Sequence, residues 1–460
     1  MKSFKIIFKN WFWGLFKPRW ITRVYDLGFA RNFLQIGLND HSICLSGLLI
    51  CTTLSCCTVN NAQNKEVVET FLFRVNSSWI FDSFKVSPDS KRVACGARAG
   101  NKYLIVIDGK EEKSYDGITK GFPIFSPDSK RVAYAAWVGN KYLIVIDGKE
   151  EKSYDRVGFP VFSPDSKRIA YVARVNNQWF VVVDGKEEKS YDDIGAGTLA
   201  FSPDSKRVAY AAQAGNKQFV VLDGEEERTY DGIGAGSLVF SSDSKRIAYV
   251  ARVNNQWFVV VDGKEEKSYD RVGFPVFSPD SKQMAYTANR DNQWFVVANE
   301  KEGKPYDRVA EGTPVFSPDS KRVAYAAKVA DKWFVVVDGK EEKSYDGIGA
   351  GTLVFSPDST RVVYGAYANN KWFIVVDGKE GKPYDKIRCL AISPNSKRVA
   401  YVAQVDNKQF VVLDGKEEKA CDGIFTTGEG KLPFDSPDSF HYLAQKEMGI
   451  YLVEETLKQQ

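Results

Sequence analysis

One phrase, Ser-Pro-Asp-Ser-Lys, recurs with small changes along most of this chain. Successive copies lie 37 or 39 residues apart, except for a last, longer step. The ten copies begin at Ser87, Ser126, Ser163, Ser202, Ser241, Ser278, Ser317, Ser356, Ser393 and Ser436. A fixed period in this range is typical of an array of identical supersecondary units. The chain is therefore predicted to form one large repeat domain behind an N-terminal segment.

One unit predicts four short strands joined by tight turns. Ser202-Pro-Asp-Ser205 has the Pro and Asp that a type I turn prefers. Asp223-Gly224 is a strong hairpin signal, because glycine accepts a positive φ without steric cost. No window shows a sustained 3.6-residue apolar period, which argues against helical repeats. The predicted strands are Leu199–Phe201, Arg207–Ala212, Gln218–Leu222 and Arg228–Asp231, and a loop follows at Gly232–Gly236.

A four-stranded sheet of this size buries too little apolar surface to be stable alone, so the units are expected to stack face to face around an axis. The string Phe-Ser-Pro-Asp-Ser-Lys-Arg-Val-Ala-Tyr, followed by an apolar strand ending in Asp-Gly, resembles the WD40-like propeller repeat of the TolB type over roughly residues 70–455. The resemblance implies an all-β fold, a β-propeller of four-stranded antiparallel blades. Ser stands where that family usually has Gly after Pro-Asp, which a type I turn tolerates.

The ends of the repeat predict how the ring closes. The C-terminal tail supplies three strands of a unit, Leu432–Phe434, Phe440–Leu443 and Ile450–Val453, but no fourth. A spare apolar strand, Val67–Val75, precedes the first unit. We expect it to complete the last blade, which gives about ten blades, nine whole and one composite. The alternatives are two smaller propellers or an open stack, and a Phe71 far from Leu452 would contradict the composite blade.

The first 60 residues differ in kind from the repeat. Residues 1–41 contain the positive charge and an amphipathic pattern, which predicts a basic helix on the inner membrane surface. Residues 42–59 are uncharged and mostly apolar, and predict a signal peptide or membrane anchor. Residues 66–460 are then the propeller. The positive-inside rule places it outside the cytoplasm, in or on a bacterial cell envelope. Lipidation at Cys56 or Cys57 and a misplaced start of the chain are the alternatives.

The composition limits the partners and the chemistry. The formal net charge is +4, of which residues 1–59 carry +5, so the propeller is nearly neutral and nucleic acid is not an expected partner. The chain has only two histidines, His41 and His441, and no Gly-x-Ser-x-Gly motif for a Ser-His-Asp triad. The cysteine spacing fits no zinc site. No catalytic residue, metal or cofactor is predicted, and Cys95 and Cys421 are expected to be free buried thiols rather than a disulfide.

One position varies while its neighbours repeat, in the connection expected between strands two and three. It follows an alanine in every blade, and in TolB-like propellers this loop belongs to the face that usually engages partners. We take it as a candidate ligand-binding position: Arg98, Trp137, Arg174, Gln213, Arg252, Asn289, Lys328, Tyr367 and Gln404. Neutral drift at an exposed loop is the alternative. Five residues on, most blades have an aromatic residue, for which packing between blades is favoured over binding: Tyr103, Tyr142, Trp179, Gln218, Trp257, Trp294, Trp333, Trp372 and Gln409.

These features favour a non-enzymatic binding module for protein, peptide or glycan, attached to a membrane through its N-terminal segment. The first alternative is a lyase or hydrolase in the central channel, which needs an Asp, Glu or Arg in a first strand. The strands Phe122–Phe125, Leu199–Phe201 and Thr313–Phe316 offer none. The second is a purely structural scaffold.

An Asp follows Tyr near the end of each unit and is expected to cap the local turn.

Overall fold

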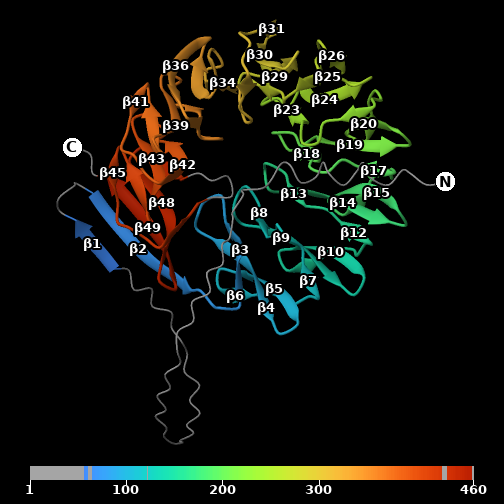
Figure 1. Cartoon of the computed structure of the whole chain (residues 1–460). Coiled ribbons are helices and arrows are strands. Elements are labelled where there is room, and N and C mark those ends of the chain that lie inside the picture. The colour runs from blue at the N-terminus through green and yellow to red at the C-terminus, as the bar shows by residue number, and fades with distance from the viewer. Residues whose placement is uncertain (1–55, 61–64, 122, 427–431, 458–460) are drawn as a thin grey trace, which may run out of the picture. The chain divides into compact units, whose positions relative to one another are not determined.

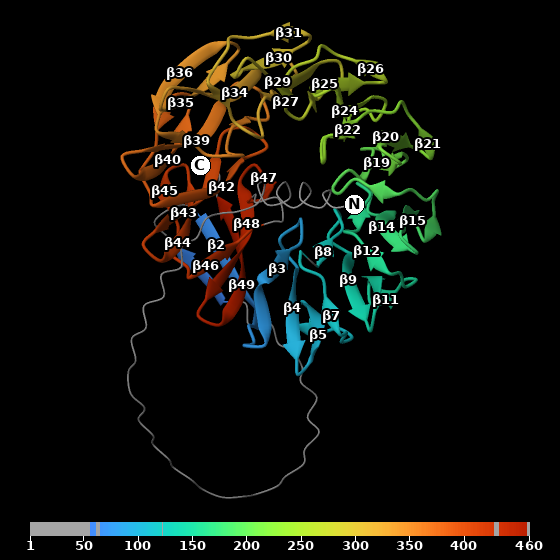
Figure 2. The same ribbon diagram turned by 45° about the vertical axis from the view of Figure 1, so that its right-hand side comes forward.

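The computed structural model describes residues 56–60, 65–121, 123–426 and 432–457. Within these ranges every regular element is a β-strand, and the strands form ten antiparallel sheets. The sheets follow one another around a centre (Figures 1 and 2), so the domain is a ten-bladed β-propeller. The predicted blade count is confirmed. The amphipathic helix and most of the apolar segment expected in residues 1–59 lie outside the described residues.

We number the blades 1 to 10 from the strand that begins at Trp79, and blade 10 holds both ends of the described chain. The second strands of blades 1 to 10 are β4 Val93–Ala99, β9 Val132–Val138, β14 Ile169–Val175, β19 Val208–Ala214, β24 Ile247–Val253, β29 Met284–Arg290, β34 Val323–Val329, β39 Val362–Ala368, β43 Val399–Val405 and β48 Ser439–Lys446. The third strands are β5 Lys102–Ile107, β10 Lys141–Ile146, β15 Gln178–Val183, β20 Lys217–Leu222, β25 Gln256–Val261, β30 Gln293–Ala298, β35 Lys332–Val337, β40 Lys371–Val376, β44 Lys408–Leu413 and β49 Gly449–Leu457.

The outer and inner strands are shorter. The outer strands are β6 Lys110–Glu111, β11 Lys149–Glu150, β16 Lys186–Glu187, β21 Glu225–Glu226, β26 Lys264–Glu265, β31 Lys301–Glu302, β36 Lys340–Tyr345, β41 Lys379–Glu380, β45 Lys416–Glu417, and in blade 10 β2 Lys65–Arg74 with β1 Cys56–Asn60 beyond it. The inner strands are β3 Trp79–Val86, β7 Gly117–Ile118 with β8 Ile124–Phe125, β12 Arg156–Val157 with β13 Val161–Phe162, β17 Asp193–Ile194 with β18 Ala200–Phe201, β22 Gly232–Ile233 with β23 Val239–Phe240, β27 Arg271–Val272 with β28 Val276–Phe277, β32 Arg308–Val309 with β33 Val315–Phe316, β37 Gly347–Ile348 with β38 Val354–Phe355, β42 Lys386–Ile392, and β46 Gly423–Phe425 with β47 Phe434–Ser436.

Most inner strands are interrupted, which corrects one sequence expectation. Gly232–Ile233, expected in a loop, pairs with the second strand of blade 5 and forms the first half of its inner strand. A hydroxyl group bridges the gap between the two halves. In blade 4, Thr198 Oγ1 donates to Gly195 O at 2.7 Å and accepts from Ala211 N at 3.0 Å. The sequence pattern does not predict this half-strand, because glycines dominate it and the strand with which it pairs lies in the following repeat.

The ring closes through the composite blade, as predicted. Strands β2 and β49 pair antiparallel, with Thr70 opposite Leu452 and Phe71 opposite Tyr451. The ion pair between Lys65 and Glu455, 2.5 Å apart and both almost fully buried, ties the two strands together. Lys65 also contacts Glu418 of blade 9, and Tyr442 donates to Glu455 at 3.0 Å. Burial, followed by the charge of Glu418, raises the pKa of Glu455 above its usual range.

The strands alternate in direction, so the turns of each blade divide between two faces of the ring. The Ser-Pro-Asp-Ser turns and the Asp-Gly turns lie on one face, which we call the motif face. The turns between strands two and three, and the links to the next blade, lie on the other, the variable face. Asp223 and Gly224 both have a positive φ, as the predicted hairpin turn requires.

The repeated motif joins each blade to the next on the motif face. The last Ser of the motif has a positive φ, 65° at Ser205, which explains why glycine suits this position. Here its hydroxyl accepts a bond from the preceding blade, Asp165 N to Ser205 Oγ at 2.9 Å. The motif arginine pairs with the Asp of its own Asp-Gly turn and reaches forward; Arg168 lies 2.8 Å from Asp184 and donates to Ser205 O at 3.1 Å.

The Asp that follows Tyr has a different role from the one expected. Asp155 accepts a bond from Lys141 of its own blade at 2.6 Å and from the backbone N of Asn176 in the next blade at 3.0 Å. These two bonds, the Lys141 bond first, hold the pKa of Asp155 below its usual range. The aspartate therefore links two neighbouring blades on the variable face and does not cap its own turn. Its partner is invisible in the sequence because it lies in the following repeat.

Tyrosine pairs fill most blade interfaces. Tyr230 of blade 4 meets Tyr249 of blade 5 edge to face, with ring centroids 6.2 Å apart, and both are buried. Cys421 and Cys95 replace one Tyr on either side of blade 10, and both are buried free thiols, as expected. Burial raises the pKa of Cys95 to about 12.

The interface between blades 10 and 1 differs from the others. The motif of blade 10 lacks the Lys-Arg that follows it in most other blades, because Ser439 is followed directly by Phe440 and His441. Elsewhere the motif serine accepts a bond from the preceding blade, as Ser205 does from Asp165 N, and we call this bond the serine latch. The hydroxyl of Ser90 is buried without a hydrogen-bond partner, so the latch is absent at this interface. Instead, His441 Nε2 donates to Asp89 O at 2.5 Å, and Phe84 packs on Phe425 with centroids 4.6 Å apart.

Candidate binding face and channel pocket

The two sets of residues singled out in the sequence are direct cross-strand neighbours. The variable residue lies in the second strand of its blade, two positions before the turn, and not in the connecting loop as expected. The correction follows from the tightness of the turn: in blade 3 it consists of Asn176 and Asn177 alone, both with a positive φ. The opposed pairs are Arg98–Tyr103, Trp137–Tyr142, Arg174–Trp179, Gln213–Gln218, Arg252–Trp257, Asn289–Trp294, Lys328–Trp333, Tyr367–Trp372 and Gln404–Gln409.

All nine variable positions lie on the variable face, and eight of them are exposed or half-buried. Asn289 is the exception, since only 6% of it is exposed, and it is not available to a partner. The repeat gives no signal for this burial, because Asn289 occupies the same register position as the half-buried residues of the other blades. The remaining residues form a ring of varied chemistry, with cations, aromatic rings and amides, around one end of the propeller.

The variable residues stack on their aromatic neighbours. The guanidinium groups of Arg174 and Arg252 lie 5.4 Å and 5.2 Å from the ring centroids of Trp179 and Trp257. In blade 8, Tyr367 and Trp372 lie 5.0 Å apart.

The aromatic residues also pack on the cores between blades. Trp179 contacts the core shared by blades 3 and 4, and Trp257 the core shared by blades 5 and 6. Their rings are thus largely covered, which agrees with the packing role favoured from the sequence.

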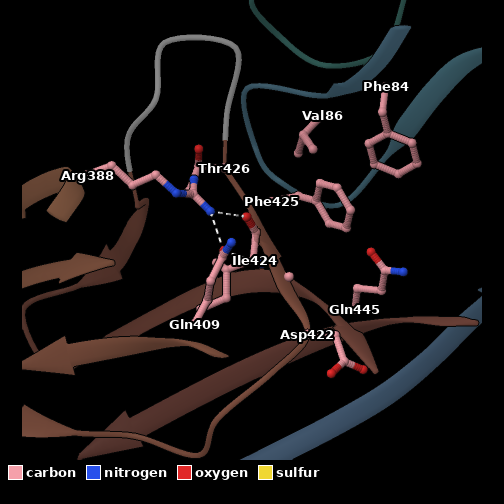
Figure 3. A pocket seen from close by; sticks show the side chains of 10 residues that line it. Phe84, Val86, Arg388, Gln409, Asp422, Ile424, Phe425, Thr426 and Gln445 are labelled. Atoms are coloured by element: carbon pink, nitrogen blue, oxygen red, sulfur yellow. Dashed lines mark hydrogen bonds between the residues drawn. The ribbon is translucent and has the colours of Figure 1, made fainter. Parts of the chain in front are cut away.

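A second candidate site lies on the wall of the channel, beside the ring closure. A pocket of about 490 Å³ opens there, and Figure 3 shows its lining. Arg388 of blade 9 donates to Gln409 Oε1 at 2.7 Å and to Ile424 O at 2.6 Å. Phe84 and Phe425 form the apolar side of the pocket. Arg388 therefore bridges blades 9 and 10 at the edge of a hollow.

Arg388 corrects the expectation that first strands contain no charge. It occupies the third inner-strand position, which is Gly in blades 3, 4, 5, 6 and 8 (Gly158, Gly195, Gly234, Gly273 and Gly349). The same position is Phe425 in blade 10. Alignment of the repeats by strand register reveals this change, whereas the glycine-rich sequence of the other blades predicts a loop at this position.

The pocket offers limited chemistry. Asp422, on its wall, already accepts from Glu447 N at 2.7 Å and from Lys408 at 2.5 Å. His441 is buried, with Nδ1 2.7 Å from Asp435 Oδ2, and both of its ring nitrogens have partners in the scaffold. Across the described ranges no group of three or more His, Cys, Asp or Glu could hold a metal ion. The arrangement suits polar recognition of a ligand better than general acid–base chemistry.

Two predictions concern the start of the chain. Cys56 and Cys57, the candidate lipidation sites, lie in β1, the strand that pairs with β2. This strand overlaps the end of the segment expected as an anchor. The part of the chain that the structure describes has no helix long and apolar enough to cross a membrane.

Comparisons with known proteins return propellers. No protein-family model matches the chain, and no curated protein matches it. Solved structures do. A eukaryotic initiation factor is 14% identical, covering 73% of this chain and 98% of its own, with a TM-score of 0.44. TolB from Acinetobacter baumannii is 18% identical over 57% of this chain and 77% of its own, with a TM-score of 0.28.

A third similar structure is the β-propeller domain of the Trilobed protease from Pyrococcus furiosus, described as having an open velcro topology. It is 17% identical over 57% of this chain and 96% of its own, with a TM-score of 0.31. Such distant likeness says nothing about partners or activity. The class of this protein, a ten-bladed propeller, follows from its own strand pairing, and its membership of the TolB-type family stays a prediction.

Proposed function

We propose that this chain is an exported or membrane-anchored propeller that acts as a non-enzymatic binding module for a protein or peptide. The proposal rests on a difference between two sets of residues in the repeat. The repeated residues join blades to one another, whereas the variable residues lie together on one face. Surfaces that combine Arg, Tyr, Trp and amide side chains are typical of protein interfaces.

Three alternatives have less support. A glycan partner would favour exposed aromatic rings, and here Arg174 and Arg252 lie over the rings of Trp179 and Trp257. An enzyme in the channel gains one feature, Arg388, but its bonds to Gln409 and Ile424 are those of a bridge between blades. A purely structural scaffold accounts for the repeated residues but gives no role to the variable ring.

The test uses the full-length chain cross-linked in its native cell envelope. We expect one stoichiometric protein partner, lost from a Tyr367→Ala, Gln404→Ala variant and retained by a Lys130→Gln, Lys167→Gln control on the motif face. Equal capture by both variants would contradict the role of the variable face. Trp294→Ala supplies a packing control, because its cross-strand neighbour Asn289 is buried: we expect it to lower stability and to leave binding per folded molecule unchanged.

A further inference from the structure

The variable face contains cations placed where they repel one another. In blade 3, Arg156 at the start of the inner strand lies directly opposite Arg174. In blade 7, Arg308 lies directly opposite Lys328. Like charges in directly opposed positions of a sheet are destabilising. The same alignment therefore occurs at two separate places in the ring.

These cations lack carboxylate partners. The side chains of Arg156, Arg308 and Lys328 form no hydrogen bond or ion pair with any residue in the described ranges, and those of Arg156 and Arg308 are exposed. The motif face is organised in the opposite way, since each motif arginine there has an aspartate, as Arg168 has Asp184 at 2.8 Å. These cations therefore differ from the motif arginines and also from variable-face lysines such as Lys141, which pairs with Asp155 at 2.6 Å.

The nearest carboxylates are already engaged. Asp155 precedes Arg156 in the chain, but its two oxygens bond Lys141 and Asn176 N. Its field also reaches Arg174. The guanidinium groups of Arg174 and Arg252 lie over the rings of Trp179 and Trp257, and Arg174 also donates to Asn177 Oδ1. The several N–H groups of a guanidinium are suited to carboxylate recognition.

The cations without a carboxylate partner form one arc over blades 3 to 7. We define this cationic arc by Arg156, Arg174, Arg252, Arg271, Arg308 and Lys328. Between them lie the amides of Gln213 and Gln218, joined to one another at 3.2 Å and half-exposed. Gln213 also donates to Gly215 O and Gln218 accepts from Ile233 N, so these amides belong to the scaffold and the cations are the groups that the arc offers to a partner.

We propose that the cationic arc is the contact surface for an acidic segment of a partner protein. The inference rests on the proposed function and names the chemistry of its partner. A nucleic acid is a poorer fit, because the chain beyond residue 59 has a net charge of −1, whereas nucleic-acid-binding domains are typically strongly basic.

The test measures binding of the full-length chain to fluorescent poly-L-glutamate by anisotropy, with heparin and single-stranded DNA as competing probes. Two variants each remove an opposed pair, Arg156→Gln with Arg174→Gln and Arg308→Gln with Lys328→Gln. We expect each to weaken poly-L-glutamate binding by about tenfold. A Lys130→Gln, Lys167→Gln variant removes the same charge from the motif face and is expected to bind as the unaltered chain does.

Several results would overturn the proposal: no binding of poly-L-glutamate, an equal loss in the motif-face control, or arc-dependent binding of heparin or DNA that is tighter than that of poly-L-glutamate. A second readout guards against misfolding, because removing a repelling charge should leave the thermal midpoint unchanged or raise it slightly. Failure here is distinguishable from failure of the binding module itself, which is tested at Tyr367 and Gln404, outside the arc.

Discussion

At the scale of single residues, the serine that ends each motif shows how one position can serve two purposes. Its positive φ is costly for any residue other than glycine, by about 1 kcal/mol. The hydroxyl of Ser205 offsets this cost with a bond from Asp165 of the neighbouring blade. A glycine would avoid the cost of the positive φ but would lose the latch. The serine therefore has a less favourable backbone conformation and gains a hydrogen bond between repeats.

Replacing this serine by alanine should therefore expose the value of the latch. We expect Ser205→Ala to lower the free energy of unfolding by about 1 kcal/mol, because Asp165 N loses its acceptor. Ser90→Ala is the matched control, since the hydroxyl of Ser90 is buried without a partner and its removal should cost less. Denaturant midpoints and hydrogen exchange at the Asp165 amide measure both effects. An equal loss in the two variants would contradict the latch.

At the scale of secondary-structure elements, the pairing of β2 with β49 depends on a buried charge. Lys65 compensates Glu455 and contacts Glu418, so removing the lysine leaves two carboxylates facing each other in a site that excludes water. The pKa of Glu455 is already raised. A group with a raised pKa in the folded state contributes stability below its unfolded value, and this contribution is lost as the pH rises through the folded value.

We therefore expect Lys65→Met to destabilise the closure by about 3–5 kcal/mol near neutral pH. The loss should shrink toward about pH 4, where Glu455 becomes protonated in both states. Thermal midpoints at the two pH values and hydrogen exchange of the β2 amides provide the measurement. Adding Glu455→Gln to the variant should recover most of the loss. A deficit independent of pH would mean that packing, and not charge, governs this site.

At the scale of the whole molecule, the ring is uneven. Most interfaces combine a serine latch, a motif arginine that bonds the next blade and a tyrosine pair. The interface between blades 10 and 1 instead contains the Phe84–Phe425 contact and the His441 bond to Asp89. Repeat arrays derive much of their stability from such nearest-neighbour contacts. We therefore expect the interface between blades 10 and 1 to be the weakest in the ring, and the channel pocket lies beside it.

Native-state hydrogen exchange should detect this difference. We expect the amides of β3, β46 and β2 to exchange through an opening of lower free energy than those of β24 and β25, which lie among intact interfaces. The difference should amount to at least about 1 kcal/mol, from the missing latch alone. Exchange that is uniform around the ring, or that begins in blade 5, would show that the substituted contacts are as strong as the repeated ones.

The sequence alone determined the architecture, because a period of 37 or 39 residues with turn signals at fixed offsets admits few solutions other than stacked four-stranded sheets. It also located the spare strand that closes the ring. Tertiary structure decided everything that depends on register and on the neighbouring blade. Asp155 bonds the following repeat, Arg388 enters the channel wall, and Arg156 faces Arg174 only once the strands are paired. A repeat fixes what each blade contains, but contacts between blades arise from the geometry of the ring.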